Sequence, residues 1–522
     1  MKSRVGFLLL AFFLIYASGR TQIGTPNLED PLSSAFFMRN RDSVRAMMVP
    51  KSCGVFFSGG YQPFEADLTQ APQFFALPDF YYLTGRRLPE SVLVLFPEPF
   101  MFEGKPCLEL LFADEDDDFA MISQRSGVKV VMDLKQWRNF CINQLSGSEF
   151  KKIHSVFSPF LDDLGWAPSA QRALLADFNS AVYPGLIFDG RSQGLYQKIL
   201  SSEDKDWDRT LAGIGAFVEY FPRLRRDPIL DRALRVTGAE DLAALKKYIS
   251  GIRLDVVTVE KGVRRLRNQK TPAEISLLRR LTQLNIAALK EGIRYCGPNQ
   301  PEYGVNAAMN WVIQVGGGTP AVPTHTALGQ PLIPAHPRWQ PHPLKEGEVR
   351  VLDAGVKLKG YQSRLTRTVP VSGSFSDDQK KVYSFLVNTQ QAVIAACKPG
   401  TVISELTEIY DQELERPLIK AGVAKNAKSL SRIRRLEGYH PIGLEQVDNT
   451  DYSPLVPGMV IVVETGIYFN DHPETNPKWK GTAYELRDMV VITPTGSEWI
   501  SRELPIHASE IEALVKASSK FE

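Results

Sequence analysis

The sequence predicts a mixed α/β protein with two domains, and three observations lead to this expectation. The chain has 522 residues, which is more than a single hydrophobic core usually organises. Its first half alternates short apolar runs, typical of buried strands, with helical stretches. Its second half contains helices with defined starts and stops, separated by further apolar strands.

In the first half, three apolar runs have the length and composition of buried strands: Gly54–Ser58, Ser91–Phe96 and Leu108–Phe112. The stretch Leu134–Gln144 has a helical pattern. This alternation is expected of an α/β layer.

In the second half, the clearest helix start is Thr271-Pro272-Ala273-Glu274. Thr271 can accept a hydrogen bond from the Glu274 amide while Glu274 reaches back, and proline is harmless at the first helical position. The segment beginning at Ser376 has the same design, and a third helix is expected from about Ser404 to Ala421. Strands are expected at Val349–Leu352, Val460–Val463 and Val490–Ile492.

Charge and composition exclude some classes of function. Lys and Arg total 61 against 59 Asp and Glu, which argues against binding nucleic acid through bulk charge. The five cysteines are scattered and show no C-x-x-C spacing, so we interpret them as small buried hydrophobic residues.

The amino terminus has the pattern of a signal peptide. Lys2 and Arg4 precede the apolar run Val5–Tyr16, and small residues at Ala17–Gly19 offer a cleavage site. The run is shorter than the roughly 20 residues that a membrane span needs. We therefore predict export to the periplasm or extracellular space and no membrane span in the mature chain; a retained anchor is the alternative.

Two segments carry a resemblance to a known family. Gln73–Gly85 reads QFFALPDFYYLTG, and Val349–Thr368 reads VRVLDAGVKLKGYQSRLTRT. Both resemble the aminopeptidase P (Xaa-Pro aminopeptidase) family, which is similar in fold to creatinase. The resemblance implies an aminopeptidase P-like amino-terminal α/β domain over residues 30–250. It also implies a pita-bread domain over residues 259–515, with a curved, mostly antiparallel sheet.

Family members of this kind hold two metal ions with two Asp, one His and two Glu. Asp353, His440 and Glu464 match three of these ligands by local motif. Arg364 and Arg487 stand at the positions of the other two, which in the family bridge the ions.

Arginine cannot replace a bridging carboxylate, because it stays protonated and offers no lone pair. A guanidinium about 4 Å from a divalent ion would cost on the order of 8 kcal/mol at an effective dielectric constant near 20. We therefore expect no metal cofactor. Our hypothesis is that Asp353 and Glu464 form buried ion pairs with the arginines; the alternative is that Arg364 and Arg487 point outward.

Other family positions give a mixed picture. His336 matches a family histidine that contacts substrate, whereas Leu436 and Val447 stand where further pocket histidines are expected. Glu485 stands where the family has an arginine. Four further histidines, at positions 325, 342, 472 and 507, lack partners at ligand spacing and are interpreted as loop or structural residues.

Three functions follow from these residues, so the sequence leaves open whether the chain is an enzyme. The first is a secreted homologue without peptidase activity that binds peptides or assembles with partners. The second is a metal-independent, creatinase-like hydrolase that uses His336 or His440 as a general base. The third is an active Xaa-Pro aminopeptidase with two manganese ions, held partly by residues such as Glu445, Asp448 or Asp488. A peptide with proline at its second position is the expected ligand, and the resemblance also suggests a homodimer.

Overall fold

The computed structural model describes residues 32–62, 73–114, 116–156, 169–182, 190–322, 324–327, 343–424, 434–448, 454–469, 478–479 and 481–521. The predicted signal peptide and His336 lie outside these residues. The chain divides into two compact units, Leu32–Lys270 and the part from Thr271 onward. No helix among the described residues is long and apolar enough to span a membrane.

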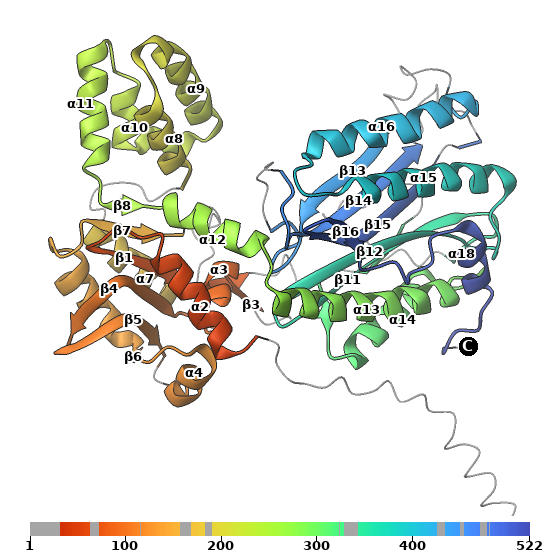
Figure 1. Cartoon of the computed structure of the whole chain (residues 1–522), viewed down its shortest axis with the longest axis horizontal. Coiled ribbons are helices and arrows are strands. Elements are labelled where there is room, and N and C mark those ends of the chain that lie inside the picture. The colour runs from red at the N-terminus through yellow and green to blue at the C-terminus, as the bar shows by residue number, and fades with distance from the viewer. Residues whose placement is uncertain are drawn as a thin grey trace, which may run out of the picture. The chain divides into compact units, whose positions relative to one another are not determined.

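The first unit contains a mixed six-stranded sheet in the order β6-β5-β4-β1-β7-β8 (Figure 1). Its central strand β1 runs antiparallel to β4 and parallel to β7. The predicted strands of this half are present, and two of them are longer than expected. The strands are β1 Ser52–Phe57, β4 Val92–Phe102, β5 Lys105–Ala113, β6 Val131–Asp133, β7 Lys152–Ser155 and β8 Leu254–Asp255. A separate hairpin pairs β2 Gly59–Gln62 with β3 Gln73–Ala76.

The helices of the first unit depart from the sequence prediction in two places. The predicted helix Leu134–Gln144 is present as a continuous helical segment, but its hydrogen bonding changes along its length: one 3₁₀-helical turn is followed by one α-helical turn (α5, Trp137–Phe140) and one π-helical turn that ends at Leu145. No other helix of this unit was predicted individually, and four of them lie between α7 (Ser169–Val182) and β8 in the chain. They are α8 Gly190–Ser201, α9 Trp207–Tyr220, α10 Pro228–Ala233 and α11 Ala239–Ser250. The other helices are α2 Ser34–Arg45, α3 Pro78–Thr84, α4 Phe119–Ser126, α7 Ser169–Val182 and α12 Thr258–Asn268.

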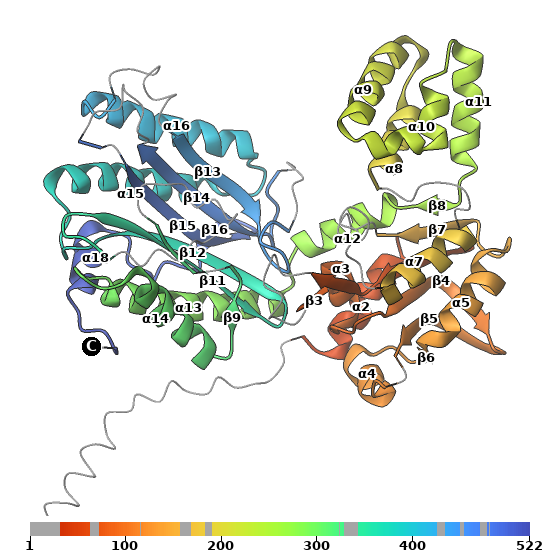
Figure 2. The same cartoon turned by 180° about the vertical axis from the view of Figure 1, so that it is seen from behind.

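The second unit is built on an eight-stranded antiparallel sheet (Figure 2). Its main path runs β10-β11-β12-β15-β14-β13, with β9 paired to β11 and β16 paired to β15. The strands are β9 Thr319–Pro320, β10 His325–Ala327, β11 Val349–Leu358, β12 Tyr361–Pro370, β13 Arg434–Pro441, β14 Val460–Phe469, β15 Thr482–Thr493 and β16 Gly496–Trp499. An α/β unit followed by this pita-bread unit confirms the predicted fold class.

Helices pack on the sheet of the second unit. Helix α13 (Pro272–Tyr295) packs against β11 and β12, and α15 (Asp377–Ala396) packs against β14 and β15. The remaining helices are α14 (Glu302–Val315), α16 (Ile403–Lys420) and α18 (Ala508–Val515). The structural division falls after α12, whereas the sequence placed the second domain's start at residue 259, within that helix.

The predicted capping boxes are confirmed, and one of them also positions the sheet. Thr271 accepts from the Glu274 amide and Glu274 reaches back to the Thr271 amide; Ser376 and Gln379 form the second box. Buried Glu274 also accepts a hydrogen bond from the Tyr361 hydroxyl at 2.7 Å, which ties the start of α13 to β12.

Candidate functional site: an arginine–carboxylate cluster

The site is a row of residues that lie directly opposite one another on neighbouring strands. Asp353 on β11 faces Thr366 on β12, which faces Arg487 on β15, which faces Glu464 on β14. Directly opposed residues on antiparallel strands share a face of the sheet, so these four side chains meet. The register therefore brings together residues that are more than one hundred positions apart in sequence.

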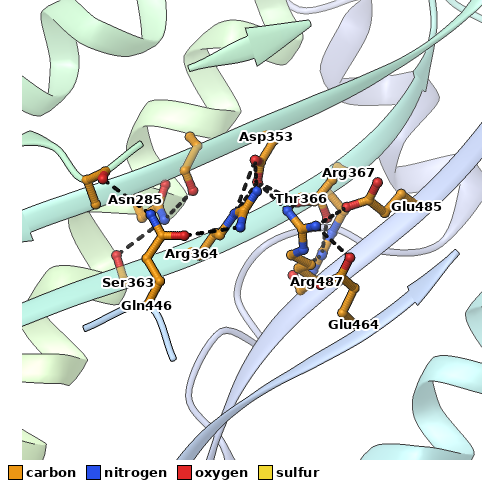
Figure 3. A network of polar contacts seen from close by, with 12 residues as sticks. Asn285, Asp353, Ser363, Arg364, Thr366, Arg367, Gln446, Glu464, Glu485 and Arg487 are labelled. Atoms are coloured by element: carbon orange, nitrogen blue, oxygen red, sulfur yellow. Dashed lines mark hydrogen bonds and ion pairs between the residues drawn. The ribbon is translucent and has the colours of Figure 1, made fainter. Parts of the chain in front are cut away.

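Arg487 lies between the two carboxylates of this row (Figure 3). Its Nη1 donates to Asp353 Oδ1 at 3.0 Å, and its Nη2 donates to Glu464 Oε1 at 2.5 Å. The arginine is buried and Asp353 is fully buried. One guanidinium thus binds both family-type carboxylates, and the hypothesised pairing is present in the structure.

Arg364 forms the second ion pair of the cluster. Its Nη2 donates to Asp353 Oδ2 at 2.8 Å, and its Nε lies 3.2 Å from the same oxygen. Thr366 donates to Asp353 Oδ1 at 2.7 Å. Both oxygens of Asp353 are therefore occupied by protein donors. The outward alternative for Arg364 is wrong, although its side chain keeps 17% exposure and also reaches Gln446.

Glu485 is a third carboxylate in the cluster. It lies two residues before Arg487 on β15 and therefore on the same face. Its Oε1 is 2.9 Å from Arg487 Nη2 without hydrogen-bond alignment, and its Oε2 accepts from the Tyr468 hydroxyl. The family pattern has an arginine followed two residues later by a glutamate. This chain has Glu485 and Arg487 at these positions, so the order of the two charges is reversed.

The environment shifts the protonation of these carboxylates in opposite directions. Burial alone would raise the pKa of Asp353, but the adjacent Arg364 and Arg487 lower it below its ordinary value. Burial raises the pKa of Glu485 to about 7, and the charges of Glu464 and Asp353 add to this while Arg487 opposes it. Near neutral pH, Glu485 is therefore the group of the cluster that gains or loses a proton.

His440 belongs to the same surface of the sheet. It lies on β13 two residues after Gly438, which is directly opposite Glu464. Burial lowers the pKa of His440, so its imidazole is neutral at physiological pH. Its Nδ1 lies 3.4 Å from the Pro441 carbonyl oxygen.

A second ion pair lies on the opposite face of the sheet, toward α15. Arg367 donates to Asp488 at 2.8 Å, and both side chains are fully buried. Asp488 also accepts from Gln390 of α15, from Trp499 and from Ser501. Asp488 therefore cannot act as the replacement metal ligand that the third hypothesis suggested.

The donor set does not fit a pair of divalent cations. Among the described residues, no three His, Cys, Asp or Glu side chains converge as a metal site. The carboxylates that could have contributed, Asp353 and Glu464, are bound by Arg487, whose fixed positive charge would repel a cation placed between them. Asp448, another suggested ligand, accepts a hydrogen bond from the Glu445 amide.

Two neighbours of the cluster, His325 and Tyr468, could not be identified from the sequence. His325 was interpreted as structural, yet its backbone on β10 is directly opposite Asp353. Tyr468 was not singled out, although it binds Glu485. Neither could be found from spacing, because both relationships depend on strand register.

Four of the five cysteines are buried, and Cys107 is partly buried.

Comparisons with known proteins agree with the fold and the motifs. Residues 276–494 match the model of metallopeptidase family M24, and residues 37–147 match that of the aminopeptidase P amino-terminal domain. The chain is 29% identical to the Xaa-Pro aminopeptidase of Escherichia coli over 271 residues, which cover 49% of this chain and 62% of that protein. It is 26% identical to the mitochondrial intermediate cleaving peptidase 55 of Arabidopsis thaliana over 362 residues, covering 63% and 71% of the two chains.

Solved structures show the same architecture along nearly the whole chain. Aminopeptidase PepP of Pseudomonas aeruginosa superposes with a TM-score of 0.69 at 21% identity, covering 94% of this chain and 99% of that one. Aminopeptidase P of E. coli with the inhibitor Pro-Leu superposes with a TM-score of 0.68 at 20% identity, covering 92% and 98%. Both family models match in chain order and the motif strands are in register, which supports the assignment of this chain to the aminopeptidase P family.

Proposed function

We propose that this chain is an aminopeptidase P homologue whose pita-bread unit has no dinuclear metal centre and binds peptides without cleaving them. The observation that carries the proposal is the position of Arg487, which contacts both Asp353 and Glu464. A buried cation there stabilises the two carboxylates in place of metal ions.

The charge of the cluster supports a peptide amino group as the ligand. Three carboxylates (Asp353, Glu464 and Glu485) face two guanidinium groups, so one negative charge is uncompensated when Glu485 is ionised. Such a site favours a single cation over two divalent ions. The ammonium group at a peptide's amino terminus has this charge.

One carboxylate oxygen is open to such a ligand. Glu464 Oε2 accepts no hydrogen bond from any described residue, and it lies 3.1 Å from where a Cβ on Gly438 would be. The absence of a side chain at Gly438 leaves that space free. A peptide with proline second is the expected ligand because of the family resemblance.

Two other functions remain candidates, each favoured by one observation. The names of the relatives favour an active Xaa-Pro aminopeptidase. The lowered pKa of His440 favours a metal-independent hydrolase, because a neutral imidazole can accept a proton.

One set of measurements separates the three. The full chain is purified with added manganese, its metal content is measured, and release of the first residue from an Xaa-Pro peptide is assayed. We expect no stoichiometric manganese and no release, together with saturable binding of an Ala-Pro peptide in the presence of a chelator. Stoichiometric metal with release supports the aminopeptidase. Chelator-resistant turnover that His440→Ala abolishes supports the hydrolase.

A matched pair of variants tests where the peptide binds. Glu464→Gln removes the open anionic oxygen and should weaken binding of the Ala-Pro peptide, whereas binding of its amino-acetylated form should not change. Glu503→Gln, at an exposed position, serves as the control. Equal binding of the free and acetylated peptides contradicts this mode of recognition.

We further propose that the chain is exported and dimeric. The basic residues and apolar run at the amino terminus support export, and sequencing the amino terminus of the secreted protein tests it. The family resemblance supports a homodimer, which sedimentation measures directly.

A further inference from the structure

The first unit contains a cavity of about 420 Å³, separate from the arginine–carboxylate cluster. It lies between the start of β1, the bend in β4 and the segment that precedes β7. Its volume is at the small end of the range for ligand pockets. The lining residues that carry the argument are Lys51, Phe96, Phe100, Glu149, Phe150 and Lys151.

Three aromatic rings form the apolar part of this cavity. The rings of Phe96 and Phe100 stack with centroids 4.6 Å apart, and those of Phe96 and Phe150 are nearly parallel at 5.9 Å. Phe96 and Phe150 are buried, while Phe100 is partly exposed. Two buried rings thus hold a third in place, and its exposed surface is available to an apolar group.

The bend in β4 creates the cavity and also limits what can enter it. Pairing of β4 with β5 shifts register between Leu95 and Phe100, so Pro97-Glu98-Pro99 bulges out of the ladder. Proline has no amide hydrogen to donate, so this segment is a poor edge for an added peptide strand. A ligand that uses side-chain contacts fits better than strand addition.

The charged residues around the cavity carry both signs. Lys51 and Lys151 are neighbours, because the Lys151 amide donates to the Lys51 carbonyl at 2.7 Å. Neither ammonium group has an ion-pair partner among the described residues. Glu98 already accepts from the Lys51 amide at 3.0 Å, whereas the exposed Glu149 carboxylate makes no such contact in the described part of the chain. The backbone amide does not neutralise Glu98, so the charged groups at the cavity are two ammonium groups and two carboxylates, and Glu149 is the carboxylate with no donor among the described residues.

We propose that this cavity binds a small zwitterion with an apolar side chain, namely a free amino acid or a dipeptide. Lys51 and Lys151 bind its carboxylate, Glu149 binds its ammonium group, and its side chain packs on Phe100. The two ammonium groups, the Glu149 carboxylate and the Phe100 ring then each have a complementary group on the ligand. The partly exposed charges imply weak binding, with a dissociation constant in the millimolar range.

Ligand-observed NMR on the full chain tests the proposal with four probes. Phenylalanine and Ala-Phe present both charges; N-acetylphenylalanine lacks the ammonium group, and phenylalanine amide lacks the carboxylate. Either zwitterion should show saturable binding, and blocking one end of phenylalanine should weaken it about threefold. If Ala-Phe binds more tightly than phenylalanine, the ligand is a dipeptide. Absence of saturable binding by all four probes, or equal binding of the free and blocked forms, overturns the proposal.

Variants connect each ligand group to its partner. The double variant Lys51→Asn, Lys151→Gln should weaken binding of phenylalanine about threefold and leave binding of phenylalanine amide unchanged. Asparagine is chosen for position 51 because it tolerates the positive φ of 56° there. Glu149→Gln should remove the preference for phenylalanine over its acetylated form. Lys129→Gln, an exposed lysine of the same unit, is the control. If Lys129→Gln weakens phenylalanine binding as much as the cavity variants do, the assignment of the ligand to this cavity is wrong.

Discussion

Arg487 Nη2 lies 2.5 Å from Glu464 Oε1, at directly opposed positions of β15 and β14. The same guanidinium reaches Asp353 through its other terminal nitrogen. A single side chain thus performs the structural task of a bridging cation, because it neutralises two carboxylates that would otherwise repel each other in a buried site. The consequence is a site whose positive charge is part of the chain and cannot be removed by a chelator.

Arg487→Ala should therefore strongly destabilise the protein. Removing one partner of a buried ion pair leaves uncompensated charge, here on Glu464 because Asp353 keeps its pair with Arg364, and costs about 3–5 kcal/mol. Chemical denaturation measures this loss. The control is Arg502→Ala at an exposed position, where a change within about 0.5 kcal/mol is expected. Similar stability of both variants would show that the buried pairing contributes little.

Reversing the charges should create a metal site. The triple variant Arg364→Asp, Arg487→Glu and Glu485→Arg places carboxylates where the family resemblance expects ligands, next to Asp353 and Glu464. We expect it to bind manganese by calorimetry, while the unmodified chain does not.

A matched control distinguishes the effect of adding carboxylate ligands from the effect of removing the two arginine charges. The double variant Arg364→Asn, Arg487→Gln removes both positive charges without adding carboxylates, and it should bind manganese far more weakly than the triple variant. If the unmodified chain binds manganese as tightly as the triple variant, the charge argument against the metal centre fails.

Glu485 should make stability fall as pH rises toward neutrality. Its pKa in the folded chain is about 7 against an ordinary 4.5, so the folded state holds a proton that the unfolded state has released. The stabilisation is complete below the unfolded pKa and is lost as pH rises through about 7, a change on the order of 3 kcal/mol. Denaturation at several pH values should show this slope in the unmodified chain and not in Glu485→Gln.

Other titrating groups do not obscure this result. The lowered pKa of Asp353 affects stability only when pH falls below its ordinary value of 3.8. The lowered pKa of His440 acts in the opposite direction, since it adds stability as pH rises toward 6.5. Both effects are present in the unmodified chain and in Glu485→Gln, so they cancel when the stability of one is subtracted from that of the other at each pH. An identical pH dependence in Glu485→Gln would exclude Glu485 as the source.

Much of the fold follows from local patterns in the sequence. Thr271 and Glu274 mark the start of α13 because a capping box needs only neighbouring residues. The apolar runs predict the cores of β11, β14 and β15, although each strand extends further than its run. The 3₁₀ and π-helical turns within residues 134–145 and the helices α8 to α11 were not predicted, because they depend on packing within the first unit rather than on a distinct local signal.

The candidate site was predictable in its residue types but not in its contacts. Arg364 and Arg487 could be identified because they interrupt family motifs. That Arg487 binds both carboxylates depends on which residues face each other across β15, β14 and β12. Strand register is set by long-range packing, so the roles of Tyr468 and the position of His325 beside Asp353 required the structure.

Asp488 provides a final test, because it distinguishes the two faces of the sheet. Its ion pair with Arg367 is fully buried on the side of α15, away from the arginine–carboxylate cluster. Asp488→Ala should cost about 3–5 kcal/mol by leaving Arg367 unpaired, which thermal or chemical denaturation detects. In protein that remains folded, binding of an Ala-Pro peptide should be unchanged, since Asp488 does not face the cluster. Loss of peptide binding from a folded Asp488→Ala variant, with Glu464→Gln as the comparison, would mean that the ligand site extends through the sheet to the α15 side.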